Sequence, residues 1–243
     1  MWSLLLKEIS EFFSTVTGYV VVVVFLLTNS LFLWIFPGDT NVLDSGYASL
    51  DTFFMMAPWI FLFLVPAVTM RSFAEESRSG TLELLFTRPL TDMQIVLGKY
   101  LAGLLLVLVS LVPTLVYVLS VWLLGNPPGN LDLGGIWGSY TGLFFLALVY
   151  VAIGIFSSSL TDNPIVAFII AVLLSFVLYI GFDFLSSMDV FQQINFLVIR
   201  IGINEHYRSM SRGVIDSRDI LYFFGVIALF LLMTRFILQS RRW

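Results

Sequence analysis

The sequence predicts an all-α polytopic membrane protein, with six transmembrane helices preceded by an amphipathic interfacial helix. Of the 243 residues, 59% are hydrophobic and only 12% are charged, whereas ordinary soluble domains carry roughly 25% charged residues. Apolar runs nearly free of charge recur along the chain, and about 20 such residues suffice for a helix to cross ~30 Å of hydrocarbon. We therefore expect a single transmembrane domain over residues 1–243, with a short helix between the second and third spans and an amphipathic outer segment before the last.

Residues 2–17 predict the interfacial helix. Apolar side chains at helical spacing form one stripe, and polar side chains fill the other face. The two sets are Trp2, Leu5, Leu6, Ile9, Phe12, Phe13 and Val16, against Lys7, Glu8, Ser10, Glu11 and Ser14. A helix with this pattern lies in the plane of the membrane interface. A cleavable signal peptide is the alternative, but the segment has no basic cluster and no small-residue cleavage site follows it.

Six apolar runs predict the membrane spans. They lie at about 18–36, 52–70, 96–124, 137–158, 164–186 and 219–238. Thr91 and Gln94 form a capping box that starts the third span, and Pro113 predicts a kink within it. Asn163 followed by Pro164 is typical of an N-cap with proline at the first helical position, so the fifth span begins there.

Two features near the last three spans, a glycine cluster and an outer loop, each have two interpretations. The glycines at the head of the fourth span either let a neighbouring helix approach closely or simply end a loop; they are Gly134, Gly135, Gly138 and Gly142. The outer loop, 187–217, has the spacing of a short amphipathic helix at Phe191, Ile194, Leu197, Val198 and Ile201, followed by His206, Tyr207, Arg208 and Arg212. This loop either contacts lipid headgroups or a companion subunit, or rests on the bilayer with its arginines reaching the surface.

The distribution of lysine and arginine predicts the orientation. Six spans place both termini on one side. With the termini inside, the inner side carries eight basic residues, Lys7, Arg71, Arg78, Arg88, Lys99, Arg235, Arg241 and Arg242, and the outer side carries four, Arg200, Arg208, Arg212 and Arg218. Basic residues concentrate on the cytoplasmic side, so we expect both termini in the cytoplasm.

The inner loop at residues 71–95 carries the signals of a short helix. Gly80 suits a left-handed cap that ends the preceding helix. Thr81 is a candidate N-cap with Glu83 in the first turn, and Pro89 ends the helix. The helix bears Leu82, Leu84, Leu85 and Phe86. Because it is apolar yet lies outside the hydrocarbon, it either docks into a partner or rests on neighbouring helices.

The segment Glu75–Pro89, E-E-S-R-S-G-T-L-E-L-L-F-T-R-P, resembles the first cytoplasmic loop of type-2 ABC exporter permeases. The number and spacing of spans and the GVIDSRDILYFF entry to the last helix extend the resemblance over nearly the whole chain. It implies that the short helix is a coupling helix that inserts into a groove of a separate cytoplasmic ATPase. The implied contact residues are Glu75, Glu76, Gly80, Thr81, Leu82, Glu83, Leu84, Leu85, Phe86 and Pro89.

Within that family, the chain resembles the permease subunits of gliding-motility transporters. This implies a bacterial inner membrane, a GldA-like ATPase subunit that holds the ATP, and a partner that is either a GldG-like companion membrane subunit or a second copy of the chain. The implied activity is export, or ATP-driven force transmission in gliding motility. The resemblance also implies that residues 187–217 form re-entrant or interfacial helices that close the outer mouth.

Other function classes fit the residues less well. No G-x-x-x-x-G-K-[ST] occurs, so we expect no P-loop and no nucleotide cofactor on this chain. With no cysteine and one histidine, His206, neither a thiolate nor a histidine metal site is expected, and no basic face suggests nucleic acid. The pair Glu75–Glu76 with Arg78 partly resembles the motif of intramembrane CAAX-type proteases, which is an alternative function. That family, however, has E-E-x-x-x-R and several histidines. The predicted spans lack the mid-span ionisable residues of secondary transporters, and a non-transporting membrane anchor remains an alternative.

Overall fold

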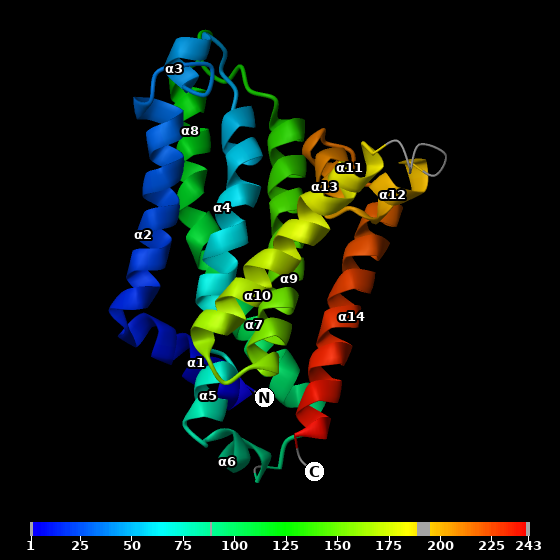
Figure 1. Cartoon of the computed structure of the whole chain (residues 1–243). Helices are drawn as coiled ribbons and strands as arrows, with labels where there is room; N and C mark the ends of the chain where they lie inside the picture. Colours follow the sequence, from blue (N-terminus) through cyan, green and yellow to red (C-terminus); the bar gives the residue numbers. More distant parts are fainter. Residues whose placement is uncertain (1, 88, 189–194, 242–243) are drawn as a thin grey trace.

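The computed structural model describes residues 2–87, 89–188 and 195–241. In this part of the chain all regular structure is helical (Figure 1), and six stretches are long and apolar enough to cross a membrane. They are Gly18–Ile35, Asp51–Arg78, Asp92–Leu124, Leu133–Leu160, Pro164–Ser186 and Ser217–Ser240. The predicted fold class is therefore confirmed, and most of the helices extend beyond the span limits expected from the sequence.

The bundle has two distinct ends. Figure 1 shows α5, α6 and both ends of the chain together at one end, which we call the α6 end, and α3 (Val42–Ser45) at the opposite, α3 end. The interfacial helix, α1 (Trp2–Ser14), lies at the α6 end and packs against α7. An extended residue, Thr15, separates it from α2 (Val16–Ser30), which continues as the π-helix η1 (Leu31–Ile35). The chain thus turns from an amphipathic helix into the first span, close to the predicted position.

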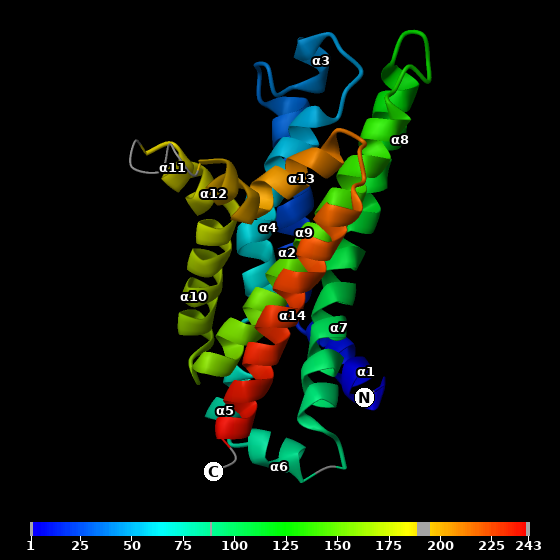
Figure 2. The same cartoon turned by 90° about the vertical axis from the view of Figure 1, so that its right-hand side faces the viewer.

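The centre of the bundle is α9 (Leu133–Leu160). Of its 18-residue apolar window, 89% is buried, and it contacts α4 (Asp51–Thr69) and, as Figure 2 shows, α14 (Ser217–Ser240), which crosses it. The sequence of α9 is apolar on all sides, and such a helix is typically buried inside a bundle. The buried side chains of these helices include Tyr150 of α9 itself, Phe61 of α4 and Phe223 of α14, each fully buried. Since lipid is as apolar as these side chains, close packing rather than water exclusion holds the helices together.

The third span is broken where proline was expected to kink it. It runs as α7 (Asp92–Leu111), the 3-10 turn η2 (Val112–Thr114) and α8 (Leu115–Leu124). Pro113 lacks an N–H and crowds the preceding turn, so the α-helical ladder cannot continue through it. The capping box that starts α7 is also confirmed: Gln94 N donates to Thr91 Oγ1 over 3.3 Å, and Thr91 N donates to Gln94 Oε1 over 3.0 Å.

The fifth span consists of α10 (Pro164–Phe176), the π-helix η3 (Val177–Gly181) and α11 (Phe182–Ser186). Its predicted start is confirmed, because Asn163 Oδ1 accepts a 2.9 Å hydrogen bond from Ile165 N. Two short helices follow, α12 (Asn195–Ile201) and α13 (Ile203–Ser211). The predicted amphipathic helix thus corresponds to α12 at Leu197, Val198 and Ile201, whereas Phe191 and Ile194 lie outside the described residues.

The glycine cluster at the head of α9 serves both of the purposes proposed for it. A Cβ on Gly138 would lie 2.5 Å from Met210 O of α13, and one on Gly142 would lie 3.1 Å from the Tyr207 ring. These two glycines therefore allow α13 to pack directly on α9. Gly134 and Gly135 instead adjoin the N-cap of α9, where Asp132 Oδ1 accepts a 3.0 Å hydrogen bond from Gly135 N.

Candidate functional site

Two short helices form an elbow at the α6 end. They are α5 (Ala74–Arg78) and α6 (Leu82–Phe86), and we call residues 74–86 the elbow. Gly80 joins them with a φ of +71°, a left-handed conformation that side chains disfavour. A Cβ at this position would meet nothing within 4 Å, so backbone conformation alone calls for glycine. The predicted break between two helices at Gly80 is confirmed.

Thr81 occupies the N-cap position of α6 as predicted, but its side chain does not cap the helix. A capping residue has an extended backbone and accepts a hydrogen bond from the first turn. Thr81 instead has helical angles, φ −79° and ψ −11°, and its side chain caps nothing. Its hydroxyl shares a 2.9 Å hydrogen bond with Ser79 and donates to Glu76 O over 3.4 Å. The hydroxyl therefore ties the turn back onto α5.

The apolar side chains of α6 point in different directions. Leu82 and Leu85 are each 7% exposed and belong to the hydrophobic core of the bundle. Leu84 is 65% exposed, and Glu83 and Pro89 are exposed as well. The side chain of Phe86 lies outside what the structure describes. Leu82 and Leu85 therefore pack α6 against the bundle, and Leu84 is left on the surface.

The two adjacent glutamates of α5 also point in opposite directions. Glu75 is exposed, and its Oε2 lies 3.8 Å from Nε of Arg71. The Glu76 side chain is only 14% exposed; its Oε2 lies 3.0 Å from Lys99 Nζ and its Oε1 lies 3.4 Å from Lys7 Nζ. The glutamates, lysines and Arg71 lie along a cavity of about 520 Å³ that separates α1 from the elbow and reaches Leu84. One carboxylate thus faces the exterior and the other fastens the elbow to the bundle.

Lys99 is the centre of that attachment. Its side chain is 1% exposed, and its ammonium donates 2.6 Å hydrogen bonds to Glu8 Oε1 and to Ser72 O, besides its ion pair with Glu76. A buried ammonium requires such a set of partners, since an unpaired one would be strongly destabilising. Glu8 belongs to α1, Ser72 precedes α5 and Lys99 belongs to α7. These contacts, which we call the Lys99 cluster, therefore join three parts of the chain.

The lysine on α1 strengthens the same connection. Partial burial lowers the pKa of Lys7, but the carboxylates of Glu76, Glu11 and Glu8 outweigh that effect and raise the pKa above its ordinary value. Lys7 therefore remains an ammonium and pairs with Glu76 across the gap between α1 and α5.

A buried serine of the central helix holds the start of α5. Ser158 Oγ accepts hydrogen bonds from Phe73 N (2.9 Å) and Ala74 N (3.0 Å) and donates to Met70 O (2.9 Å). The first N–H groups of a helix have no partner within the helix, so an external hydroxyl that satisfies two of them fixes where the helix begins. The neighbouring Ser157 bonds only within α9, to Ile153 O.

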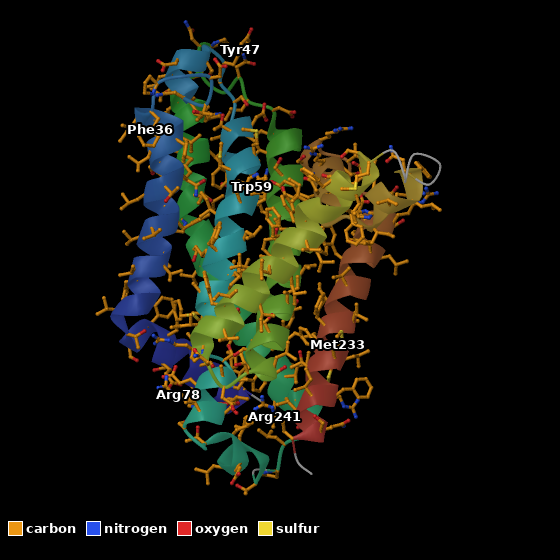
Figure 3. The ribbon with its side chains drawn as sticks, viewed as in Figure 1. Phe36, Tyr47, Trp59, Arg78, Met233 and Arg241 are labelled. Carbon is orange, nitrogen blue, oxygen red and sulfur yellow. The ribbon has the colours of Figure 1, made fainter. Side chains whose placement is uncertain are left out.

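The far side of α5 is bonded to the end of the last span. Arg241 Nη1 donates to Ser77 Oγ over 2.6 Å and to Asp162 Oδ1 over 2.9 Å, and Ser77 also donates to Asp162. The Ser77 hydrogen bond, with the Arg241 guanidinium beside it, lowers the pKa of the Asp162 carboxyl. Figure 3 shows Arg241 and Arg78 at the same end of the bundle. The elbow is therefore joined to α14 and to the α9–α10 connection.

Sequence reasoning located the elbow but missed what holds it in place. In the sequence, Lys99 served only as one of the basic residues that predict the orientation. A lysine within an otherwise apolar helix is, however, itself a signal of a buried partner. Ser158 had no distinguishing signal, because hydroxyls at the end of a span are common. Its role depends on the tertiary approach of α4 and α5.

The protease alternative receives no support from this geometry. His206 lies on α13, toward the α3 end, far from Glu75 and Glu76 (Figure 1). Its Nδ1 is 2.7 Å from Asp219 Oδ1, its Nε2 is 2.8 Å from Arg200 O, and its ring stacks on Tyr222 at 3.9 Å. Within the described ranges, no three histidine, aspartate or glutamate side chains converge to hold a metal ion. His206 thus fastens α12, α13 and α14 together.

Comparison with known protein families agrees with the architecture. The family described as ABC-2 family transporter protein matches residues 3–239, nearly the whole chain. The search among curated proteins gives no match. Members of this family are the membrane-spanning permease subunits of ABC transporters and work with a cytoplasmic ABC ATPase. The chain is a multi-pass membrane protein that belongs to the ABC-2 transporter family.

Proposed function

We propose that the elbow is the segment through which the ATPase drives this permease. The observation that carries the proposal is the set of polar contacts that tie α5, a helix of five residues, to α1, α7, α9 and the residue that follows α14. Glu76 reaches α1 and α7, the start of α5 bonds to Ser158 of α9, and Ser77 bonds to Arg241 beyond α14. Because these bonds are short and several are buried, a displacement of the elbow moves the ends of those helices with it.

The exposed side of the elbow suits docking to a protein. A helix of about two turns is unstable alone, since nucleation is not recovered over so few residues. Burial of Leu82 and Leu85 supports α6 from one side, so Leu84 can remain exposed for a partner. Exposed Glu83 adjoins it with a negative charge, which would steer a basic groove toward it and add salt dependence to association.

The complex we propose follows from the resemblance of Glu75–Pro89 to the coupling loop. The elbow and both termini would face the cytoplasm of a bacterium, with the chain in the inner membrane. The permease would be GldF-like, with a GldA-like ATPase, and its second membrane subunit would be a GldG-like protein or another copy of the chain. ATP binding would close the ATPase pair and rearrange the helices, either for export or to transmit force in gliding motility.

The docking proposal is tested with Leu84→Asp. Fully burying a leucine is worth ~1.5–3 kcal/mol, and ~1.4 kcal/mol corresponds to tenfold in affinity. The variant should therefore bind the ATPase at least tenfold more weakly in co-purification from mild detergent at several salt concentrations. Leu43→Asp is the matched control, because Leu43 is 61% exposed at the α3 end. Leu85 is unsuitable, since its side chain is buried in the chain itself.

Retention of the ATPase by folded Leu84→Asp at the parental level would refute docking through α6. The composition of the complex is a separate question. Mass spectrometry of subunits that co-purify with the parent should find GldA-like and GldG-like proteins, or a mass corresponding to two copies of the chain. An ATPase together with a different companion would remove the gliding-motility assignment and leave the docking proposal intact.

A further inference from the structure

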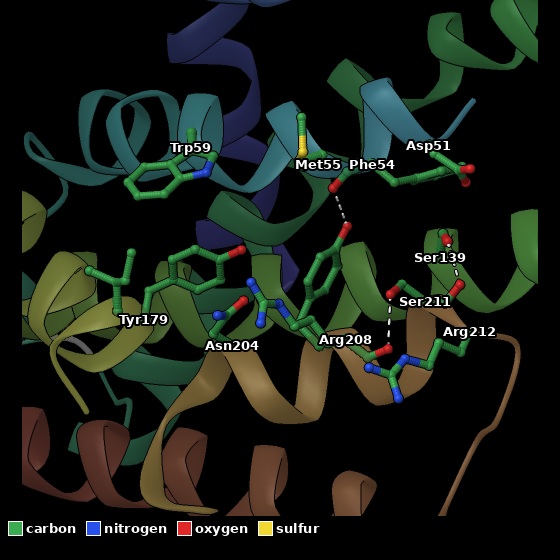
Figure 4. Close-up of a pocket in the computed structure, with 12 residues that line it drawn as sticks. Asp51, Phe54, Met55, Trp59, Ser139, Tyr179, Asn204, Arg208, Ser211 and Arg212 are labelled. Atoms are coloured by element: carbon green, nitrogen blue, oxygen red, sulfur yellow. Dashed lines mark hydrogen bonds between the residues drawn. The ribbon is translucent and has the colours of Figure 1, made fainter. Parts of the chain in front are cut away.

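A second cavity, of about 360 Å³, lies toward the α3 end, between α4, η3 and α13. Aromatic and other apolar side chains form much of its wall: Phe54, Met55, Trp59, Tyr179 and Tyr207. Figure 4 shows Trp59 and Tyr179 on one side of the view, and Asp51 and Arg212 on the other. Asp51 begins α4 and Trp59 lies eight residues further, which at ~1.5 Å per residue is about 12 Å along the helix. The lining is therefore polar at the Asp51 end of the cavity and aromatic at the Trp59 end.

Arg208 of α13 and Arg212, the residue that follows α13, line this cavity. Arg208 lies in the last turn of α13, and Arg212 caps the end of that helix four residues further. Figure 4 shows Arg208 reaching toward Tyr179 and Asn204. The α13 helix is fixed beneath them, because Tyr207 donates a 2.6 Å hydrogen bond to Phe54 O of α4. The guanidinium groups are thus presented by a rigid wall.

Neither arginine has an anionic partner in the described part of the chain. None of the ion pairs there includes Arg208 or Arg212. Asp51 lines the same cavity without pairing with them, and Asp183 instead accepts from Asn204. Both arginines are exposed, so their guanidinium groups are accessible to an anion from outside the chain. A guanidinium matches phosphate or carboxylate oxygens with two parallel hydrogen bonds.

We propose that this cavity binds an anionic amphiphile. Its phosphate or carboxylate group is held by Arg208 and Arg212, and its apolar part lies along Met55, Trp59 and Tyr179. Asp51, which also lines the cavity, weakens binding by repulsion and disfavours ligands with more negative charge. The site goes beyond the proposed function and does not depend on whether the elbow docks an ATPase.

The test uses the full chain in nonionic detergent, with dihexanoyl phosphatidylglycerol as the probe. Trp59 reports binding through its fluorescence; because the chain has six tryptophans, the signal is the difference between the parent and Trp59→Phe. The double variant Arg208→Gln/Arg212→Gln should bind at least tenfold more weakly. Arg200→Gln should bind like the parent, because Arg200 lies over the Phe196 ring at 4.0 Å and does not line the cavity.

Asp51→Asn should bind the probe severalfold more tightly, a gain that a misfolded protein cannot imitate. If the double arginine variant fails to fold, the affinity of Asp51→Asn for the probe still tests the site, and an unchanged or weaker affinity would overturn it. Equal binding of dihexanoyl phosphatidylcholine would overturn the requirement for net negative charge. Competition by inorganic phosphate at the same concentration as the lipid would show a free-anion site and overturn the amphiphile. Unchanged affinity in the folded double variant would overturn the site itself.

Discussion

Lys99 Nζ and Glu8 Oε1 lie 2.6 Å apart, although 91 residues separate them in the chain. The contact joins α1 to α7 at a position where the lysine is 1% exposed. Lys99 also forms an ion pair with Glu76 of the elbow. The interfacial helix is therefore part of the same assembly as the elbow, rather than an independent membrane anchor.

Lys99→Met should destabilise the chain substantially. Removing one partner of a buried ion pair leaves the other charge unpaired, which costs ~3–5 kcal/mol; the carboxylates here are 14% and 17% exposed, which favours the lower value. Thermal unfolding in detergent should show this loss. Lys7→Met is the matched control, because its side chain is 53% exposed and exposed pairs contribute ~0–1 kcal/mol. Equal stability of the two variants would mean that the Lys99 cluster does not hold the elbow.

Ser158→Ala should loosen the start of α5. It leaves the N–H groups of Phe73 and Ala74 without their shared acceptor, and each buried unsatisfied donor costs ~1–3 kcal/mol. Ser157→Ala, at an equally buried neighbouring position, removes only a bond within α9 and should cost roughly 1 kcal/mol or less. Hydrogen exchange of residues 73–78 measures the effect. Similar protection of these amides in both variants would contradict the assignment.

Gly138→Ala should disturb the packing of α13 on α9. The new Cβ would lie 2.5 Å from Met210 O and 2.6 Å from Gly213 Cα, so the backbone must shift at a cost of ~1–3 kcal/mol. Gly225→Ala in α14 meets nothing within 4 Å and should be neutral or stabilise the helix by up to ~1 kcal/mol. Faster hydrogen exchange over 203–211 in the first variant alone is the expected result. Unchanged exchange would show that α13 does not rest on this glycine.

Alkaline phosphatase fusions test the orientation. The enzyme is active only outside the cytoplasm, so a fusion after Gly129, in the connection between α8 and α9, should be active. A fusion after Arg241, at the α6 end, should be inactive. The eight-to-four distribution of basic residues across the two sides motivates this expectation. The reverse pattern would place the elbow outside and exclude a cytoplasmic ATPase as its partner.

The local signals in the sequence predicted the fold well. The capping box at Thr91, the Asn163–Pro164 start and the break at Pro113 all depend on neighbouring residues, so pattern alone revealed them. The stripe on α1 was equally legible, because helical periodicity needs no tertiary information. These elements fix the number and order of the spans.

Contacts between residues far apart in the chain could not be predicted from the sequence pattern. Nothing near Leu82 or Leu85 distinguishes them from Leu84, because only the position of α6 against the bundle buries two of the three. The same holds for Glu76 and Glu75, whose partners lie on α1 and α7 in one case and on the preceding turn in the other. Thr81 followed the composition of an N-cap, but the hydroxyls of Ser79 and Thr81 closed the turn differently.

The unbroken course of α9 links the start of the elbow to the cavity lined by Arg208 and Arg212. Ser158, which fixes the start of the elbow, and Ser139, which lines the arginine cavity, are on this one helix, 19 residues or ~29 Å apart at ~1.5 Å per residue. Unlike the third and fifth spans, α9 has neither a 3-10 turn nor a π-helix within it. One continuous helix therefore carries both the serine that anchors the elbow and the serine that lines the second cavity.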